Sequence, residues 1–374
     1  VPTKEGGTIR IEMTAKAELP ASFTRKADND ILALALGLKK GGEKVIFISK
    51  DINMRVKAEV LGLEVQDFEK SKVNIDELYT GWKAIEVDDK IVNEFHSQKK
   101  MPSPDKDLLP QQFVLLKSKS DSKKTALAMY SPKEELLVKL KHDTVSPWGL
   151  KPLNMEQRFA FEAMLNEEIK LVTLVGIAGT GKTLLALACG LHMTFDSEAY
   201  RRVLISRPVV PMGKDIGYLP GSKEEKLANW MGAFYDNLEF LVETSGRNFS
   251  RNEDGKKTQK KSSKIVDDLF KTGKLEMEAL TYLRGRSIPR QFIIIDEAQN
   301  LTPLEVKTIV SRAGKDTKVI VTGDPYQIDN PYLDSSSNGL TYLAEKFKGQ
   351  NLFAHITLGK SERSELAGLA AELL

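Results

Sequence analysis

The sequence predicts an α/β protein whose largest part is built around a parallel β-sheet. Its second half contains short apolar runs rich in β-branched residues, separated by stretches with helical apolar periodicity. The runs expected to form strands are 171–175, 203–206, 292–295 and 318–322. Strands that alternate with helices along a chain pair in parallel, because each helix carries the chain back across a face of the sheet. A glycine-rich segment follows the first run and acidic residues follow the third, which indicates a ligand site at the carboxyl edge of this sheet.

The composition is that of a globular protein and excludes a disordered or fibrous chain. The 374 residues include 55 Lys and Arg against 52 Asp and Glu, which gives a formal net charge of +3, and 41% are hydrophobic. No apolar run approaches the roughly 20 residues that span a membrane, so no membrane partner is expected. No signal peptide heads the chain, and the single cysteine, Cys189, cannot form an intrachain disulfide. We therefore expect a cytoplasmic location.

The chain is expected to divide into three regions. Residues 1–82 combine a helical run after Asp28, an apolar strand at 45–48 and a second helix, which is typical of a parallel sheet. Residues 83–150 contain short alternating segments separated by Pro, Ser and Lys, which indicate a small antiparallel, β-rich connector. Residues 151–374 carry the α/β pattern described above.

A polar tract interrupts the third region at 246–264. It has no apolar periodicity, and its seven basic and two acidic residues give a net charge of +5. Such a composition cannot bury enough apolar surface to order itself, so we expect a disordered insertion. A grip on the phosphate backbone of a nucleic acid is the alternative.

A phosphate-binding loop is predicted at 176–183. The segment fits GxxxxGK[ST] in full, follows an apolar strand and opens an apolar helix. Its glycines let the backbone wrap closely around phosphate groups, and the helix N-terminus adds positive potential. Lys182 is expected to reach the β- and γ-phosphates of a bound nucleotide during catalysis, and Thr183 to bind Mg²⁺. The residues expected to bind the nucleotide are Gly176, Gly179, Thr180, Gly181, Lys182 and Thr183.

Asp296 and Glu297 follow the apolar run at 292–295. A buried strand would deliver both side chains to the sheet edge where the phosphate loop also lies. Asp296 is expected to hold the Mg²⁺ of the nucleotide through water, and Glu297 to polarise the attacking water as a general base. A lone Asp-Glu pair is more often a helix cap or an exposed pair, but its place after this strand favours the catalytic interpretation.

Three further residues are candidates for the nucleotide site, and each also has an ordinary structural interpretation. Gln327 ends the polar turn Gly323-Asp-Pro-Tyr-Gln and could sense the γ-phosphate, or could belong to an ordinary Asp-Pro turn. Gln157 could read the edge of adenine, or belong to a capping segment that starts a helix. Arg363 could supply charge to the transition state, in cis or across a subunit boundary, or be an exposed arginine at a helix N-terminus.

The remaining polar residues give weaker signals. Arg207 and Lys214 lie in a Pro- and Gly-rich loop, where they could contact phosphates of a ligand or a neighbouring subunit, or be solvated. The four histidines have no cysteine or carboxylate partner at ligand spacing, so zinc is not expected. Cys189 lies on the apolar helix after the phosphate loop and is expected to be a core residue.

Taken together, these motifs resemble the PhoH family of P-loop ATPases, which is related to superfamily 1 helicases. The resemblance covers 155–374, and it implies a RecA-type parallel sheet with Mg²⁺-dependent hydrolysis of ATP. The matching segments are Gly176 to Thr183, 206–221, Trp230-Met231, Asp236 to Leu238, 278–286, Asp296 to Gln299 and Gly323 to Gln327.

Residues 1–82 resemble the second half of a PIN nuclease domain, as in PIN–PhoH fusions. The similarity lies in Asp28 to Ala33 and in 45–59. PIN nucleases cluster acidic residues that hold Mg²⁺ or Mn²⁺ and activate water for phosphodiester cleavage, and Asp28 and Asp51 match two of those positions. The family's first aspartate and its helical acid are not identifiable in this chain, which does not begin with Met. We therefore expect this metal site to be incomplete here.

For the whole chain the resemblance implies an enzyme that acts on RNA. ATP hydrolysis would move or unwind the RNA, and the PIN part would cut it. PhoH-like ATPases are expected to form rings, commonly hexamers, which would give Arg363, or Arg284 and Arg286, a role across the subunit boundary. Two alternatives stay open: a nucleotide-driven regulatory or scaffold module that does not translocate, and a metal-dependent RNase with an ancillary ATPase.

Overall fold

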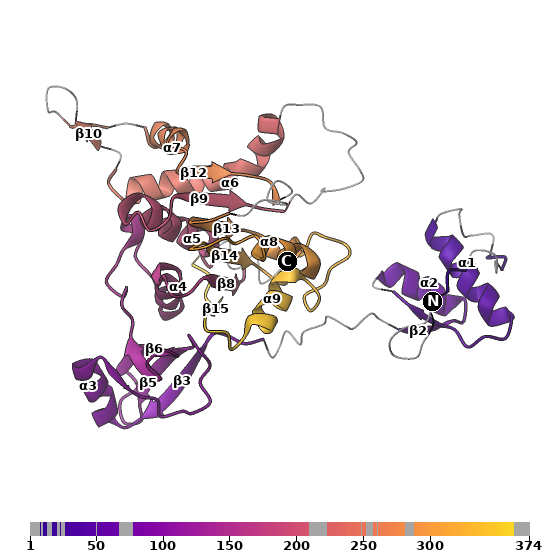
Figure 1. The fold of residues 1–374 in the computed structure, drawn as a ribbon, viewed down its shortest axis with the longest axis horizontal. Coiled ribbons are helices and arrows are strands. Elements are labelled where there is room, and N and C mark those ends of the chain that lie inside the picture. The colour runs from indigo at the N-terminus through magenta and orange to yellow at the C-terminus, as the bar shows by residue number, and fades with distance from the viewer. Residues whose placement is uncertain are drawn as a thin grey trace. The chain divides into compact units, whose positions relative to one another are not determined.

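The protein forms two compact units, Val1–Lys72 and Val73–Leu374. Figure 1 shows the helices and strands of both units. The computed structural model describes residues 8, 10–12, 17–20, 23, 27–49, 51–66, 78–208, 223–247, 249–251, 257–259, 261–280 and 288–362.

The described residues of the first unit form two helices and a two-stranded parallel sheet. The predicted helix, strand and helix are α1 (Ala27–Lys40), β1 (Ile46–Ile48) and α2 (Ile52–Val60). A second strand, β2 (Glu64–Gln66), pairs with β1 in parallel. The small core between the helices and the sheet is centred on side chains from all three predicted elements, namely Leu32, Phe47, Met54 and Ala58.

The second unit begins with a five-stranded sheet in the order β3-β5-β6-β7-β4. The sequence predicts an antiparallel module, but β3 pairs with β5 in parallel. The reason is a helix that the sequence did not reveal, α3, which carries the chain across one face before β5 begins. The elements are β3 (Trp82–Val87), α3 (Asp89–Gln98), β4 (Lys100–Pro102), β5 (Phe113–Ser118), β6 (Thr125–Ser131) and β7 (Leu136–Lys139).

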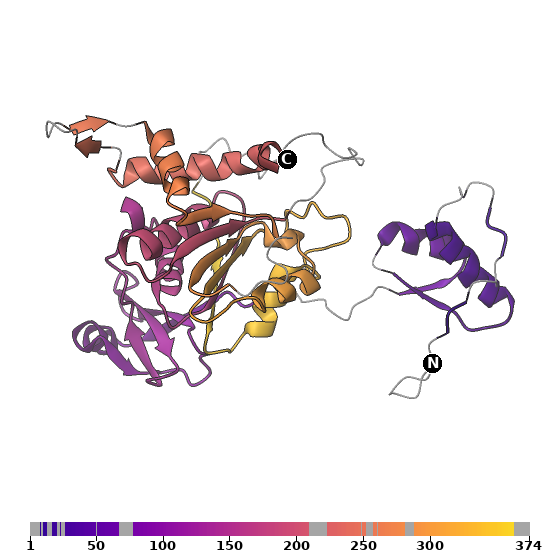
Figure 2. The same ribbon diagram turned by 45° about the horizontal axis from the view of Figure 1, so that its top comes forward.

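A six-stranded parallel sheet forms the centre of the second unit, in the order β12-β9-β13-β14-β8-β15. Four of its strands are the apolar runs that the sequence predicts, so the expected parallel α/β fold is confirmed. Figure 2 shows these strands side by side. The strands are β8 (Leu171–Gly176), β9 (Arg202–Ser206), β12 (Leu275–Met277), β13 (Gln291–Ile295), β14 (Lys318–Gly323) and β15 (Phe353–Leu358).

Helices cover both faces of this sheet, because side chains alternate across each strand and both sets are apolar. Within the part of the chain that the structure describes, one face packs against four helices and the other against two. The first four are α4 (Met155–Leu165), α5 (Lys182–Leu191), α6 (Lys223–Thr244) and α7 (Ser262–Lys271). The other two are α8 (Pro303–Val310) and α9 (Gly339–Phe347).

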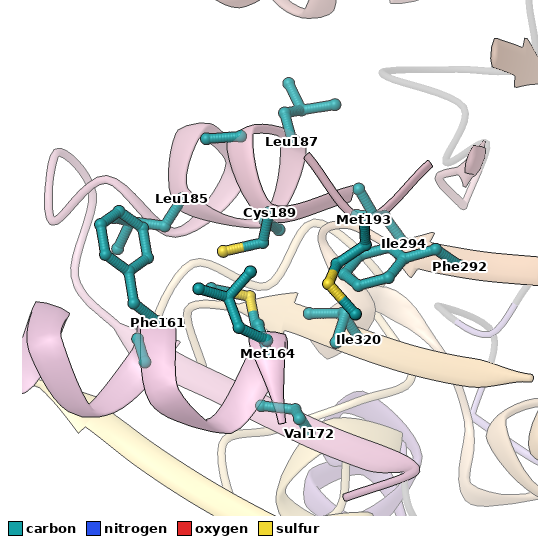
Figure 3. Packing of buried hydrophobic residues seen from close by; sticks show 14 of the residues in the cluster. Phe161, Met164, Val172, Leu185, Leu187, Cys189, Met193, Phe292, Ile294 and Ile320 are labelled. Atoms are coloured by element: carbon teal, nitrogen blue, oxygen red, sulfur yellow. The ribbon is translucent and has the colours of Figure 1, made fainter. Parts of the chain in front are cut away.

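Cys189 lies in the core between α4, α5 and the sheet. Its side chain is fully buried among Phe161, Met164 and Leu185 and their neighbours, as Figure 3 shows. Burial raises the pKa of its thiol far above the ordinary value, because an apolar environment disfavours the thiolate. The cysteine is therefore an inert core residue, as its place on an apolar helix predicts.

Parts of the basic tract at 246–264, for which the composition predicts disorder, form regular structure in the described residues. Two short strands, β10 (Phe249–Arg251) and β11 (Lys257–Gln259), pair antiparallel, and α7 begins at Ser262. Among the described helices, none is long and apolar enough to cross a lipid bilayer.

Candidate nucleotide-binding site

The phosphate loop connects β8 to α5, as its sequence predicts. Gly179 and Gly181 adopt left-handed φ angles of 83° and 87°, which residues with a Cβ atom rarely adopt. Gly176 lies so close to the neighbouring strand that a Cβ atom there would be 2.6 Å from the carbonyl oxygen of Leu358. The glycines of the motif are therefore required by this backbone path, and α5 begins with its N–H groups at the loop.

The side chains of the loop are held by its own carbonyl groups. Lys182 Nζ donates hydrogen bonds to the carbonyl oxygens of Gly176, at 2.7 Å, and of Ile177, at 3.0 Å. The hydroxyl of the buried Thr180 donates to Ile177 at 3.0 Å. Phosphate oxygens would compete for the Lys182 ammonium, since a charged acceptor makes a stronger hydrogen bond than a peptide carbonyl.

Asp296 lies directly after β13 and faces the first turn of α5. Thr183 Oγ1 donates a hydrogen bond to Asp296 Oδ1 at 3.0 Å, and Thr322 Oγ1 from the end of β14 donates to the same oxygen. The carboxylate is 4% exposed. Hydroxyl and carboxylate oxygens are the donors that Mg²⁺ prefers, and phosphate oxygens and water complete its shell in nucleotide sites. Thr183 and Asp296 therefore fit a Mg²⁺ site.

Glu297 is the next residue and has a left-handed φ of 52°. Its carboxylate pairs with the guanidinium of Arg207 at 3.2 Å and accepts a hydrogen bond from Gln299 Nε2. Arg207 thus lies at the site, so the structure brings one of the two loop cations to the acidic pair. Lys214, the other, lies outside the described residues.

Gln299 ties the acidic pair to the loop that follows β14. Its Nε2 donates to the carbonyl oxygen of Gln327 at 2.8 Å, and its Oε1 accepts from the backbone N–H of Asp324 at 3.1 Å. Gln327 is thereby held beside the carboxylate of Glu297, with its own side chain exposed. Sequence reasoning assigned no role to Gln299 or Thr322, although Gln299 follows Asp296 by only three residues.

Gln157 contacts the phosphate loop from α4. Its Nε2 donates to the carbonyl oxygen of Thr180 at 3.3 Å, and its Oε1 accepts from the backbone N–H of Leu153 at 2.8 Å. The side chain of Asn154 caps the helix by accepting from the Gln157 N–H at 2.9 Å. Both atoms of the Gln157 amide therefore have protein partners. A contact of Gln157 with adenine stays a prediction.

The segment after β15 also reaches the phosphate loop. The N–H of Glu362 donates to the carbonyl oxygen of Gly179 at 3.0 Å, and the Ser361 hydroxyl donates to Ala178 at 3.3 Å. Arg363 follows directly but lies outside the described residues, as do Arg284 and Arg286. Their roles stay predictions.

Asp28 and Asp51 belong to the first unit. Asp51 is the N-cap of α2 and accepts hydrogen bonds from the N–H groups of Asn53, at 2.8 Å, and Met54, at 3.2 Å. Asp28 lies in the first turn of α1, where a negative charge favours the helix dipole. In the part of the chain that the structure describes, no three His, Cys, Asp or Glu side chains gather into a metal site.

A glycine-rich loop at a helix N-terminus, with a buried Asp opposite the loop threonine and a Glu beside it, defines a P-loop nucleoside triphosphatase. Two family models match the chain: "PhoH-like protein" over residues 149–372 and "PIN domain" over residues 2–69. The chain therefore belongs to the PhoH family, and it is a PhoH-like P-loop ATPase with an N-terminal PIN domain.

Relatives of the same organisation match the whole chain. Protein PhoH2 of Bacillus subtilis (strain 168) is 45% identical over 387 residues, which cover 100% of this chain and 84% of the relative. Protein PhoH2 of Thermobispora bispora is 35% identical over 380 residues, with 100% and 81% covered. The crystal structure of Pif1 helicase from Candida albicans matches with 16% identity over 59% of this chain and 43% of its own, at a TM-score of 0.30, which is too low to carry an inference.

Proposed function

We propose that this chain hydrolyses ATP with Mg²⁺, couples hydrolysis to binding and moving or unwinding RNA, and carries a PIN part that cuts RNA. The observation that supports the ATP-dependent part most directly is the carboxylate of Asp296, which accepts from Thr183 and Thr322 together. This contact supports the proposal, because the two residues expected to hold Mg²⁺ then lie within hydrogen-bond distance of each other at the phosphate loop.

Each residue of the site has a role in this proposal. Lys182 neutralises charge on the β- and γ-phosphates, and Glu297 orients the attacking water and accepts its proton. Bound Mg²⁺, held by Thr183 and by Asp296 through water, would neutralise charge that develops on the phosphate oxygens. Gln327 senses the γ-phosphate, because Gln299 joins its backbone to Glu297.

The loop between β14 and α9 supports a single-stranded nucleic acid as the partner. Tyr326 and Tyr332 on this loop are 66% and 70% exposed. The buried Asn300 fixes the loop, because its Oδ1 accepts from the N–H groups of Asp329 and Asn330 at 2.8 and 3.2 Å. Exposed aromatic rings on a fixed loop are suited to stack on unpaired bases.

The test is the rate of ATP turnover with and without single-stranded RNA, with the Lys182→Ala variant as the control. We expect RNA to raise the wild-type rate and single-stranded DNA of the same sequence to raise it less. A wild-type ATPase that RNA neither stimulates nor binds in a salt-sensitive way would instead favour a regulatory or scaffold module.

We further propose that the subunits form a ring in the cytoplasm, hexameric by analogy with PhoH-like ATPases. In such a ring Arg363, or Arg284 and Arg286, would complete the ATP site of the adjacent subunit. Light scattering gives the mass of the assembly. Mixing Lys182→Ala subunits with Arg363→Ala subunits then tests the role across the boundary, because such mixtures recover turnover only if the arginine acts in trans.

A further inference from the structure

A solvent-open cavity of about 450 Å³ lies at the edge of the five-stranded sheet, beside the segment that leads from β7 towards α4. It is lined by the end of α3, by β4 and β7, and by the segment that follows β7. Four exposed lysines contribute to its wall, Lys99, Lys100, Lys139 and Lys141. A volume of this size is in the range of ligand sites in proteins.

Backbone hydrogen bonds hold these lysines together. The N–H of Lys139 donates to the carbonyl oxygen of Lys99 at 2.8 Å, and Lys100 lies opposite Val138 in the antiparallel pair of β4 and β7. Lys99 adopts a left-handed φ of 62° at the end of α3, where glycine is the usual residue. A positive charge at a helix C-terminus is favourable, but that explains only one of the four lysines.

The charge of this cluster is only partly balanced. Lys100 pairs with Glu134 at 3.2 Å, and the carboxylate of Asp143 is engaged by Arg158 through two hydrogen bonds of 2.7 and 2.6 Å. For the other three lysines, no acidic partner occurs among the described residues. Like charges repel at short range, so an anion in the cavity would relieve an unfavourable arrangement.

Helix α4 connects this cavity to the phosphate loop. Arg158 on α4 holds Asp143 at the cavity wall, and the adjacent Gln157 donates to Thr180 of the phosphate loop. The buried carboxylate of Glu162, one turn further along α4, accepts from the N–H of His142 at 2.8 Å. One rigid helix thus contacts both the wall of the cavity and the nucleotide site.

We infer that the cavity lined by Lys99, Lys100, Lys139 and Lys141 binds phosphate groups of the RNA backbone, as a second RNA contact outside the ATPase sheet. This inference rests on the proposed function, which supplies the RNA. No aromatic side chain is among the described residues that line the cavity, so the contact is to phosphates and is independent of base sequence. Its link to α4 makes the contact able to influence ATP turnover.

The test uses the full chain with Lys139→Glu and Lys141→Glu combined. The matched control is Lys106→Glu with Lys123→Glu, which changes the charge equally at exposed lysines of the same module that do not line the cavity. Affinity for single-stranded RNA is measured against salt concentration. We expect the cavity variant to bind about tenfold more weakly, and its salt slope to fall by about 1.4, because each phosphate contact on a single strand contributes about 0.7. The control variant should bind as the wild type does.

The outcomes separate this inference from the proposed function. If the wild type itself does not bind RNA, both fail. If the wild type binds and the cavity variant binds as tightly as the control, only the inference fails. A third arm measures the binding of inorganic tripolyphosphate to the wild type and to the cavity variant. If the cavity variant loses tripolyphosphate binding but keeps its RNA affinity, the cavity binds a free polyphosphate and the RNA contact is overturned. Basal ATP turnover without RNA should be unchanged in both variants, because neither alters the nucleotide site.

Discussion

The Thr322 hydroxyl, at the end of β14, donates a hydrogen bond to the carboxylate of Asp296, at the end of β13. This contact exists because β14 lies between β8 and β13 in the sheet, so its C-terminal end lies between the phosphate loop, which follows β8, and the acidic pair, which follows β13. The carboxylate oxygen that accepts from Thr322 also accepts from Thr183. Thr322 is therefore a positioning residue for Asp296.

Replacing Thr322 by Val should lower ATP turnover while the protein stays folded. A hydrogen bond to a charged group contributes about 1.5–3 kcal/mol, and its loss would let the carboxylate rotate away from the metal position. We expect kcat/KM for ATP to fall at least tenfold and the Mg²⁺ concentration for half-maximal activity to rise. The Thr322→Ser variant keeps the hydroxyl and should restore both quantities. Equal losses in the two variants would contradict a positioning role.

Replacing Glu297 by Gln should separate binding from hydrolysis. The amide keeps the size of the side chain and can still bond to Gln299, but it cannot accept a proton from the attacking water. We expect ATP affinity to stay within about twofold, and the single-turnover rate to fall by about 10²–10⁴. Glu168→Gln, which neutralises an exposed carboxylate, is the control. Normal turnover in Glu297→Gln would show that another group activates the water.

The sequence predicts the parts of the site that depend on short spacing. Lys182 and Thr183 are fixed by one loop, and Asp296 and Glu297 by the strand that precedes them. The role of Thr322 could not be predicted, because it depends on which strand lies between β8 and β13. The same holds for Arg207, whose ion pair with Glu297 joins residues far apart in the chain.

The edge strand β15 was not predicted from the sequence, for a related reason. His355 interrupts the apolar run of β15, yet it is buried with its Nδ1 2.6 Å from Thr173 Oγ1. Burial lowers the pKa of His355 to about 3, so the ring stays neutral and fits the sheet. The sequence could not predict Thr173 as the partner of His355, because the two residues meet only when β8 and β15 pair in the sheet.

The two exposed tyrosines should determine RNA affinity through their rings. Stacking on an aromatic side chain contributes about 1–3 kcal/mol per base, so combining Tyr326→Ala with Tyr332→Ala should weaken binding of single-stranded RNA at least tenfold. The corresponding double Phe variant keeps both rings and should bind as the wild type does. ATP turnover without RNA serves as the check on the nucleotide site. A double Ala variant with unchanged RNA affinity would exclude this loop from the RNA path.

Lys318 should make the stability of the second unit depend on pH. Its side chain is fully buried and donates to the carbonyl oxygens of Ala163 and Asn166 at 2.8 and 2.6 Å. Burial lowers the pKa of Lys318 from its ordinary value of 10.5 to about 7. Between these two values the unfolded chain binds a proton that the folded chain does not. The free energy of unfolding should therefore rise with pH across this window, by up to about 1.4 kcal/mol per pH unit.

The measurement is urea unfolding at pH 7.5 and pH 9.5. Lys318→Met removes the titrating amine, so the rise between the two pH values should shrink relative to the wild type. Its stability at a single pH is not informative, since two carbonyl groups at the end of α4 lose their donor. Lys315→Met, an exposed neighbour, should keep the full rise. A wild type whose stability is flat or falls from pH 7.5 to 9.5 would contradict a lowered pKa.

Replacing Asp51 by Asn should show whether this residue only caps α2 or also acts in a nuclease site. Asn caps a helix N-terminus about as well as Asp does, so Asp51→Asn should change the free energy of unfolding by no more than about 0.5 kcal/mol. If Asp51 also holds Mg²⁺ or Mn²⁺ in a PIN-type site, the same change should abolish metal-dependent cleavage of a labelled RNA, because an amide is a poor ligand for a hard cation. Lys182→Ala should leave cleavage intact while it stops ATP turnover. Cleavage at the wild-type rate in Asp51→Asn would assign this residue to the cap of α2 alone.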